Sequence, residues 1–184
     1  MRPGGAPLGS DVIHAFGNSH PVLGPRVFVA PSADVIGRVE LGEDASVFFQ
    51  CVLRADINSI RVGARSNVQD QTTLHVASDL GVSLGDDVSV GHGCIIHACA
   101  IGNRVLVGMG SIIMDGAVVG DDCLIAAGSL LPKGKVYEAG SLIMGSPAKA
   151  LRKLSREEIA GIGALARKYV HVKDVYLQTR AWPG

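Results

Sequence analysis

The sequence predicts an all-β fold, a parallel β-helix of hexapeptide repeats, with a C-terminal α-helix. Three regularities support this prediction. An aliphatic residue recurs every six positions, a small or slender residue follows it four positions later, and glycine often stands directly after the aliphatic residue. In a three-sided coil the aliphatic side chain fills the interior, and the small residue lets the backbone turn the corner. Three sides of six residues make a coil of 18, and coils stack as parallel strands roughly 4.8 Å apart.

Two sets of residues define the repeat. The aliphatic set is Val29, Val35, Leu41, Val47, Leu53, Val62, Val68, Leu74, Leu84, Val90, Ile96, Ile101, Val107, Ile113, Val119, Ile125 and Leu131. The small set is Ala45, Cys51, Ser66, Thr72, Cys94, Ser111, Ala117, Cys123 and Ser129. Because both sets keep the same spacing, we expect both to point into the coil.

Three irregular steps interrupt the spacing. Three extra residues fall around residues 56–59, four fall near residues 77–81, and one residue is missing between Ile96 and Ile101. Loops inserted into a repeat array usually gather on its working face, so we expect a functional site near these insertions.

The chain divides into four segments. Residues 1–28 form an N-terminal lead-in that is rich in Gly and Pro at its start, and residues 29–136 form the β-helix, whose pattern stops after Leu131. Residues 137–154 cross over to residues 155–184, the C-terminal helix.

The predicted helix has a start signal and one apolar face. Ser155 followed by Glu158 is a capping box. The apolar face consists of Ile159, Ile162, Ala166, Tyr169, Val172 and Tyr176. We expect this face to pack along the β-helix.

Composition argues against several classes of protein. Lys and Arg number 17, as do Asp and Glu, so no net charge attracts nucleic acid or an anionic membrane. No apolar run is long enough to span a bilayer, and the N-terminus lacks the apolar core of a secretory signal. The four cysteines form no CxxC pair, which favours reduced thiols and a cytoplasmic location.

Three of the six histidines lie within residues 74–97, and their spacing predicts a metal site. His97 follows His75 by 22 residues, one coil of 18 plus the four-residue insertion, so the two stack on one side of the prism. His92 precedes His97 by five residues and therefore lies on a neighbouring side. One chain cannot easily bring three such rings together, whereas a homotrimer can place His92 of one subunit against His75 and His97 of the next. Three imidazoles with one open position are typical of catalytic zinc.

The alternative interpretation is a polar ladder on the outside of the coil. His14, His20 and His171 lack the one-coil relation, and we expect them to be surface or packing residues. Cysteine ligands are disfavoured. Cys51, Cys94 and Cys123 belong to the small inward set, and Cys99 has no assignable role.

Four sequence motifs extend over this region: VLRADINSIRVGARSNVQDQTTLHV, VGHGCIIHAC, VGMGSIIMDGAVV and GSPAK. Together, over roughly residues 25–155, they resemble the γ-class carbonic anhydrase family of trimeric left-handed β-helix proteins. The resemblance implies reversible hydration of CO2 to bicarbonate in a homotrimer, with Zn2+, or Fe2+ or Co2+ in some members, as the metal. It implies metal ligation by His75 and His97 of one chain and His92 of the next. It also implies catalytic roles for Arg54, Asp56, Gln69 and Asp70.

The repeat supports two of these assignments independently. Leu53 and Leu74 are one coil plus the three-residue insertion apart, which places Arg54 over His75. In the same way Asp70 lies one coil plus four residues before His92. Arg54 and Asp56 can form an interface salt bridge or take part directly, and Gln69 is a neutral donor and acceptor that suits a metal-bound hydroxyl.

Departures from the family leave other functions open. Ile57 stands where the best-known members carry glutamate, Ile143 where many shorter relatives carry tyrosine, and Asp79 alone occupies a loop that is acidic in the best-known members. These departures predict slow proton release and low turnover. A hexapeptide acyltransferase or coenzyme A thioesterase with a histidine base and no metal is one alternative. A scaffold protein with weak catalysis is another, and the three retained histidines argue against it.

Overall fold

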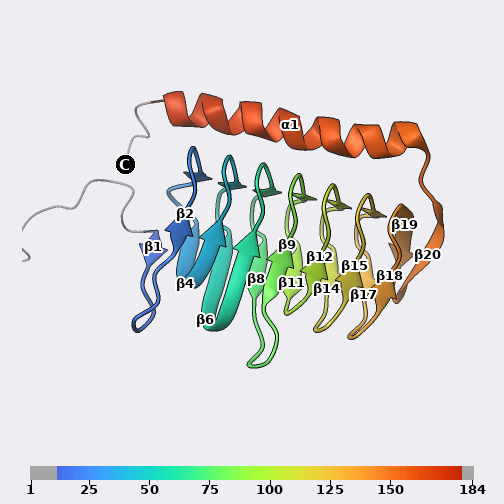
Figure 1. The fold of residues 1–184 in the computed structure, drawn as a ribbon, viewed down its shortest axis with the longest axis horizontal. Helices are drawn as coiled ribbons and strands as arrows, with labels where there is room; N and C mark the ends of the chain where they lie inside the picture. The colour runs from blue at the N-terminus through green and yellow to red at the C-terminus, as the bar shows by residue number, and fades with distance from the viewer. Residues whose placement is uncertain (1–11, 180–184) are drawn as a thin grey trace, which may run out of the picture.

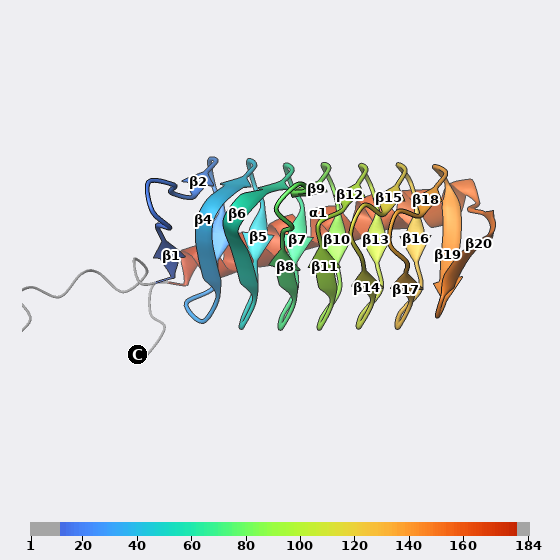
Figure 2. The ribbon, with the colours of Figure 1, turned by 90° about the horizontal axis from the view of Figure 1, so that it is seen from below.

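The described residues form a three-sided parallel β-helix with one long α-helix lying along it (Figure 1). The computed structural model describes residues 12–179, so the Gly/Pro-rich start of the predicted lead-in lies outside the described residues. Figure 2 shows the successive coils in a row, with the helix behind one of their faces. The predicted fold class is confirmed.

Side 1 of the β-helix is a sheet of eight strands within residues 12–179. Its strands are β3 (Phe28–Val29), β5 (Ser46–Val47), β7 (Asn67–Val68), β10 (Ser89–Val90), β13 (Leu106–Val107), β16 (Leu124–Ile125), β19 (Ser141–Gly145) and β20 (Ala148–Lys153). From β3 to β19 the neighbours pair in parallel, and β20 turns back antiparallel to β19.

Sides 2 and 3 share a second sheet, with twelve strands in the described residues, which bends at the corner between them. Side 2 contains β8 (Thr73–His75), β11 (Ile95–His97), β14 (Ile112–Ile113) and β17 (Leu130–Leu131). Side 3 contains β9 (Val82–Leu84), β12 (Ala100–Ile101), β15 (Val118–Val119) and β18 (Val136–Tyr137). The long strands β4 (Asp34–Leu41) and β6 (Val52–Val62) continue through both sides, and β1 (Ile13–His14) and β2 (Val22–Leu23) pair with the two halves of β4. The lead-in thus adds a partial coil.

The interior has the composition that the repeat predicts. Every aliphatic residue of the repeat except the half-buried Val29 is at most 3% exposed, and every residue of the small set is at most 1% exposed. The buried hydroxyls bond to backbone carbonyls of the corners. Ser66 Oγ donates to the carbonyl of Gly85 at 2.8 Å, and Thr72 Oγ1 donates to that of Gly91 at 3.0 Å. Small polar residues therefore enter the core without leaving an unpaired group.

The corner between sides 3 and 1 carries a ladder of ion pairs. The pairs are Arg26–Asp44, Arg65–Asp87 and Arg104–Asp122, with N···O distances of 2.6 to 2.8 Å. All six residues have φ between 53° and 59°, a left-handed conformation that non-glycine residues seldom adopt. The stacked corner imposes this conformation in coil after coil.

The repeat continues beyond Leu131 for two more sides of a coil. Tyr137 of β18 pairs with Val119, and Ile143 of β19 pairs with Ile125, each six residues beyond the previous interior position. Tyr137 occupies an aliphatic position, and its hydroxyl donates to the carbonyl of Ala148 at 3.0 Å. An aromatic residue with a satisfied hydroxyl thus closes the end of the core.

Helix α1 (Arg156–Gln178) covers side 1. Its N-cap is Ser155, and the predicted capping box with Glu158 is present. Ile162 and Ala166 are buried, and Tyr176 stacks on Phe28 with ring centroids 5.2 Å apart. The predicted packing of the helix along the β-helix is therefore present. No helix among residues 12–179 is both long and apolar enough to cross a bilayer.

A buried lysine also joins the helix to the β-helix. Lys173 is fully buried, and its Nζ lies 2.7 Å from Oδ1 of Asp44 at the ion-pair corner. Arg26 donates to both oxygens of Asp44, and Asp174 contacts Lys173 as well. The charge of the lysine is therefore balanced where the helix meets the first coils.

Candidate metal centre

His75 and His97 lie side by side on side 2. Each is the last residue of its strand, β8 or β11, and the parallel register places His97 directly against His75. In the preceding coil Arg54 of β6 pairs with His75. The one-coil relations that the spacing predicts for these three residues are all present.

Each of the two imidazoles turns one nitrogen toward the other ring and one toward a carboxylate. His75 Nδ1 lies 3.2 Å from His97 Nε2. His97 Nδ1 lies 2.6 Å from Asp115 Oδ1, and His75 Nε2 lies 3.3 Å from Asp56 Oδ1. An ionised carboxylate only accepts hydrogen bonds, so each ring carries its N–H on the carboxylate side. When both rings are neutral, the two nitrogens that face each other are lone pairs.

Two lone pairs at this distance repel each other unless a cation lies between them. Nitrogen ligands about 2.05 Å from a tetrahedral zinc are about 3.3 Å apart, close to the 3.2 Å found for these rings. Imidazole suits zinc and iron among other metals. A proton on one ring would also satisfy the distance, as an N–H···N hydrogen bond. The pair therefore fits a metal ion and offers two ligands for it.

His92 lies at a different corner of the coil. It follows β10 between sides 1 and 2, and its Nδ1 lies 2.8 Å from Oδ2 of Asp70, which stands one coil earlier as the spacing predicts. About half of its side chain is exposed. Among residues 12–179 of one chain, no three His, Cys, Asp or Glu side chains are grouped so that they could hold a metal ion. A single chain thus supplies two converging imidazoles and a third at another corner.

Asp56 links Arg54 to His75. Its Oδ2 accepts a hydrogen bond from Arg54 Nη1, and the backbone N–H of Ile57 donates to its Oδ1 at 3.0 Å. Burial alone raises the pKa of Asp56, but the bonds from Arg54 and from the backbone outweigh it and hold that pKa below its usual value. Asp56 is thus an ionised acceptor for the N–H of His75.

Gln69 lies beneath helix α1. Its side chain is buried, and its Nε2 donates to Asn67 Oδ1 at 3.0 Å. Asn67 in turn donates to Ser89 Oγ at 2.9 Å, and Tyr169 of the helix contacts Gln69. Within one chain the structure does not bring Gln69 to the His75–His97 pair.

Asp115 is absent from the residues that the sequence predicts for the site. It follows β14 and reaches back to His97 in the previous coil. The hydrogen bond from His97 lowers the pKa of Asp115 below its usual value. The spacing could have indicated this contact, because Asp115 follows His97 by 18 positions, one full coil.

Exposed apolar side chains surround the histidines. Ile95 and Ile112 point outward from side 2 and are 47% and 39% exposed. Met109 follows β13 one coil after His92, and Met114 follows β14 one coil after His97; both are exposed. Apolar residues grouped in this way mark a surface suited to contact with another protein.

The other histidines and the cysteines do not join this site. His14 bonds Asp34 at 3.0 Å on the first coil, and His20 and His171 are exposed. All four cysteines are free and buried, as predicted for Cys51, Cys94 and Cys123. Burial raises the pKa of Cys99 to about 12, which keeps its thiol protonated.

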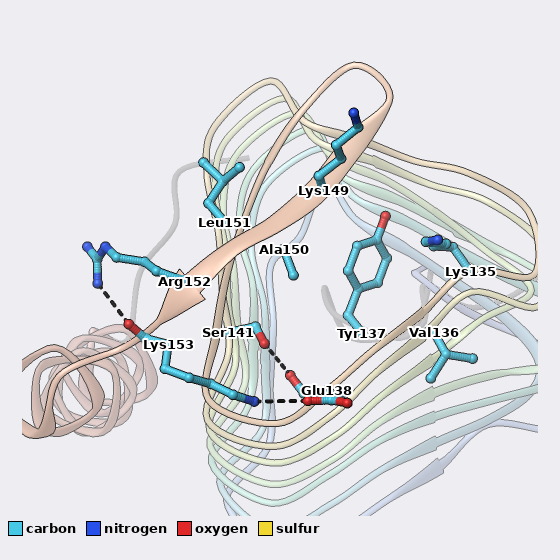
Figure 3. A pocket seen from close by; sticks show the side chains of 10 residues that line it. All are labelled: Lys135, Val136, Tyr137, Glu138, Ser141, Lys149, Ala150, Leu151, Arg152 and Lys153. Carbon is cyan, nitrogen blue, oxygen red and sulfur yellow. Dashed lines mark hydrogen bonds and ion pairs between the residues drawn. The ribbon is translucent and has the colours of Figure 1, made fainter.

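A hollow of about 570 Å³ lies at the C-terminal end of the β-helix, far along the chain from the histidines. It is bounded by β18 and by β20, which crosses the end of the prism (Figure 3). Tyr137 points into it, and Lys135 and Lys149 stand on either side. No histidine lines this hollow.

Comparison with known proteins gives one family and several relatives. Residues 98–133 match the family described as bacterial transferase hexapeptide (six repeats). Protein YrdA of Escherichia coli K12 is 46% identical over 175 residues, which cover 91% of this chain and 95% of that protein. The mitochondrial γ carbonic anhydrase 2 of Arabidopsis thaliana is 41% identical over 162 residues, or 85% of this chain. The chain spans only 58% of the length of that plant protein.

A solved structure agrees with these matches. A hexapeptide transferase family protein from Anaplasma phagocytophilum has a TM-score of 0.86 at 40% identity. The alignment covers 90% of this chain and 98% of that one. The similarity therefore extends over most of this chain.

Proposed function

Because the chain belongs to the γ-class carbonic anhydrase family of hexapeptide-repeat proteins, we propose that it catalyses the reversible hydration of carbon dioxide to bicarbonate. The observation that carries the proposal is the pair His75–His97, whose facing nitrogens are 3.2 Å apart while their other nitrogens meet carboxylates. Such a pair attracts a cation, and the family reaction requires one.

The proposed site is shared between subunits of a homotrimer. His75 and His97 of one subunit and His92 of the adjoining subunit hold a divalent metal, Zn2+, or Fe2+ or Co2+ in its place. Two observations support the sharing. His92 stands at another corner than the pair, and exposed Ile95, Ile112 and the neighbouring methionines offer an apolar surface beside both. A second copy of the chain would cover that surface and complete the ligand set in the same step.

The metal and the protein have separate tasks. When bound by the three imidazoles, a divalent ion would supply acidity by lowering the pKa of a water molecule to about 7. Asp56 and Asp70 accept the N–H of His75 and of His92, and so fix which nitrogen of each ring is free to bind. Arg54 holds Asp56 in place and presents its remaining N–H groups to bicarbonate.

Gln69 can act at the site only if its side chain changes its hydrogen bonds. It neighbours Asp70 in the chain and would reach the shared site from the subunit that supplies His92. Its amide would first have to give up its bond to Asn67. Ile143 is fully buried in the interior of side 1 and takes no part in the site. With Ile57 in place of an ionisable residue beside Asp56, the described site offers few groups to carry a proton away. We therefore propose a low turnover.

The hexapeptide transferase match supports a second candidate, an acyltransferase or coenzyme A thioesterase that uses one of the histidines as a base. Such an enzyme needs no metal. A catalytically weak scaffold is a third candidate, and it would bind the metal without turnover. The free thiols of all four cysteines support a cytoplasmic location in each case.

One experiment separates the three candidates. Protein loaded with zinc, and separately with iron, is assayed for CO2 hydration by stopped flow, together with its metal content. We expect about one metal per subunit and hydration that disappears in His97→Ala. Metal without hydration would support the scaffold, and turnover of a coenzyme A ester by metal-free protein would support the transferase.

A further inference from the structure

We propose that Asp115 is a positioning residue of the metal centre, which fixes the tautomer of His97 so that Nε2 is the binding nitrogen. The proposal rests on the proposed function, because it assumes that His97 is a ligand. None of the motif-based assignments includes Asp115. Its Oδ1 accepts from His97 Nδ1 at 2.6 Å, the shortest of the three histidine–aspartate contacts around the candidate centre.

A short contact matters because neutral imidazole has two tautomers. With its proton on Nδ1, His97 presents a lone pair at Nε2, the atom that faces His75. With its proton on Nε2, the ring would turn an N–H toward the metal and could not bind it there. The carboxylate of Asp115 selects the first tautomer and makes the ring a stronger ligand.

The backbone around Asp115 is held from both sides. Its carbonyl accepts from the N–H of Gly134 at 2.8 Å, and Gly116 donates to the carbonyl of Ala98 at 2.7 Å. Gly116 has a φ of 68°, which lets the chain turn immediately after the aspartate. Ala98 follows His97 and donates to the carbonyl of His75 at 2.9 Å. The aspartate and both histidines therefore stand on one stacked corner, which leaves little freedom in their relative positions.

The contact differs from an ordinary surface ion pair. Both partners are about one-third exposed, and the carboxylate stands on the coil beyond His97 while His75 stands on the coil before it. His97 thus bonds a carboxylate on one face and meets the second imidazole on the other. A surface pair that only stabilised the fold would not need this alignment.

The test compares Asp115→Ala, Asp115→Asn and Asp34→Asn in the full-length protein. Zinc dissociation constants come from competition with a chelator, and the tautomer of His97 comes from 15N NMR of metal-free protein at alkaline pH. Asp34 is the control, because it makes a 3.0 Å contact with His14, away from the centre.

Asp115→Ala should weaken zinc binding by about 10- to 100-fold and shift His97 from the Nδ1–H toward the Nε2–H tautomer. Asp115→Asn keeps an acceptor oxygen and should lie between Ala and the native protein. Asp34→Asn should match the native protein. If His97→Ala abolishes zinc binding while Asp115→Ala changes neither affinity nor tautomer, the role of Asp115 is refuted and the metal site stands. If His97→Ala leaves zinc binding intact, the proposed function itself fails.

Discussion

Nδ1 of His75 lies 3.2 Å from Nε2 of His97, and a carboxylate occupies the far side of each ring. The arrangement follows from the repeat, because residues one coil apart stack on the same side. It also limits what the pair can do. With both N–H groups directed at Asp56 and Asp115, only a positive charge between the rings relieves the repulsion of their lone pairs.

The apolar surface beside the histidines should form the subunit interface. Ile112→Lys places a charge on side 2, and we expect it to convert trimers into monomers and to remove bound metal, with the β-structure unchanged. Val118→Lys is the matched control, because Val118 is 40% exposed, like the 39% exposed Ile112, but lies on side 3. Sedimentation and metal analysis report both effects. A monomer that keeps its metal would contradict the shared site.

Arg54 should act in turnover rather than only in the interface. Arg54→Met removes the partner of Asp56, and we expect kcat/KM for CO2 hydration to fall about tenfold or more, with the trimer and its metal retained. Arg61→Met on the same strand is the control, and it should leave kcat/KM unchanged. Dissociation of the Arg54→Met trimer in sedimentation would instead assign the Arg54–Asp56 pair to the interface.

The buried Lys173 should make Asp44 critical for stability. Asp44→Asn removes the more buried of the two carboxylates that contact Lys173 and leaves only Asp174, and we expect a loss of about 3 kcal/mol in the free energy of unfolding. Asp122→Asn is the control at the same corner position of a later coil, with φ of 57° against 59° for Asp44. It pairs with a half-exposed Arg104 and should cost less than about 1 kcal/mol. Urea unfolding measures both, and equal losses would contradict this role for Lys173.

The same carboxylate should make stability depend on acid pH. The hydrogen bond from Arg26 lowers the pKa of Asp44 from 3.8 to about 2; burial opposes the shift, and Lys173 adds to it. A carboxylate whose pKa is lower in the folded than in the unfolded protein stabilises the fold when it is ionised. The contribution of Asp44 is therefore complete above about pH 4, and it is lost as the pH falls toward the folded-state pKa of about 2. It amounts to about 2 kcal/mol. The difference in unfolding free energy between native protein and Asp44→Asn should therefore narrow by about that much from pH 5 to pH 2. A difference that stays constant over this range would rule out the depressed pKa.

The sequence predicts interior and register well because both follow from a period. Six-residue spacing identifies side chains that must be buried, and the arithmetic of one coil places Arg54 over His75 and Asp70 over His92. The pattern ends too early at Leu131, because Tyr137 occupies an aliphatic position in the next coil. The buried hydroxyl of Tyr137 is stable there because it donates a hydrogen bond to the carbonyl of Ala148. The six-residue spacing does not predict that tertiary contact.

Side-chain contacts between elements were the part that spacing could not predict. Lys173 lies within the predicted helix, but its burial depends on Asp44, which is distant in the chain. The neutral amide of Gln69 suits an active site, yet the residue is buried on side 1, where helix α1 covers it. Asp115 follows His97 by one full coil, a relation that the spacing contains, but the hydrogen bond between their side chains is a contact that the spacing does not define.

Complementation between two inactive variants tests the shared metal site most directly. His92→Ala and His75→Ala chains, each expressed alone, should form trimers that bind no zinc, because every site lacks a ligand. When the two chains are co-expressed in equal amounts, a complete site forms wherever His75 and His97 of the His92→Ala chain meet His92 of the His75→Ala chain. Random assembly of a cyclic trimer makes that about a quarter of the sites. Recovery of about a quarter of the native zinc content is the predicted result, and mixed trimers that remain free of zinc would contradict the account.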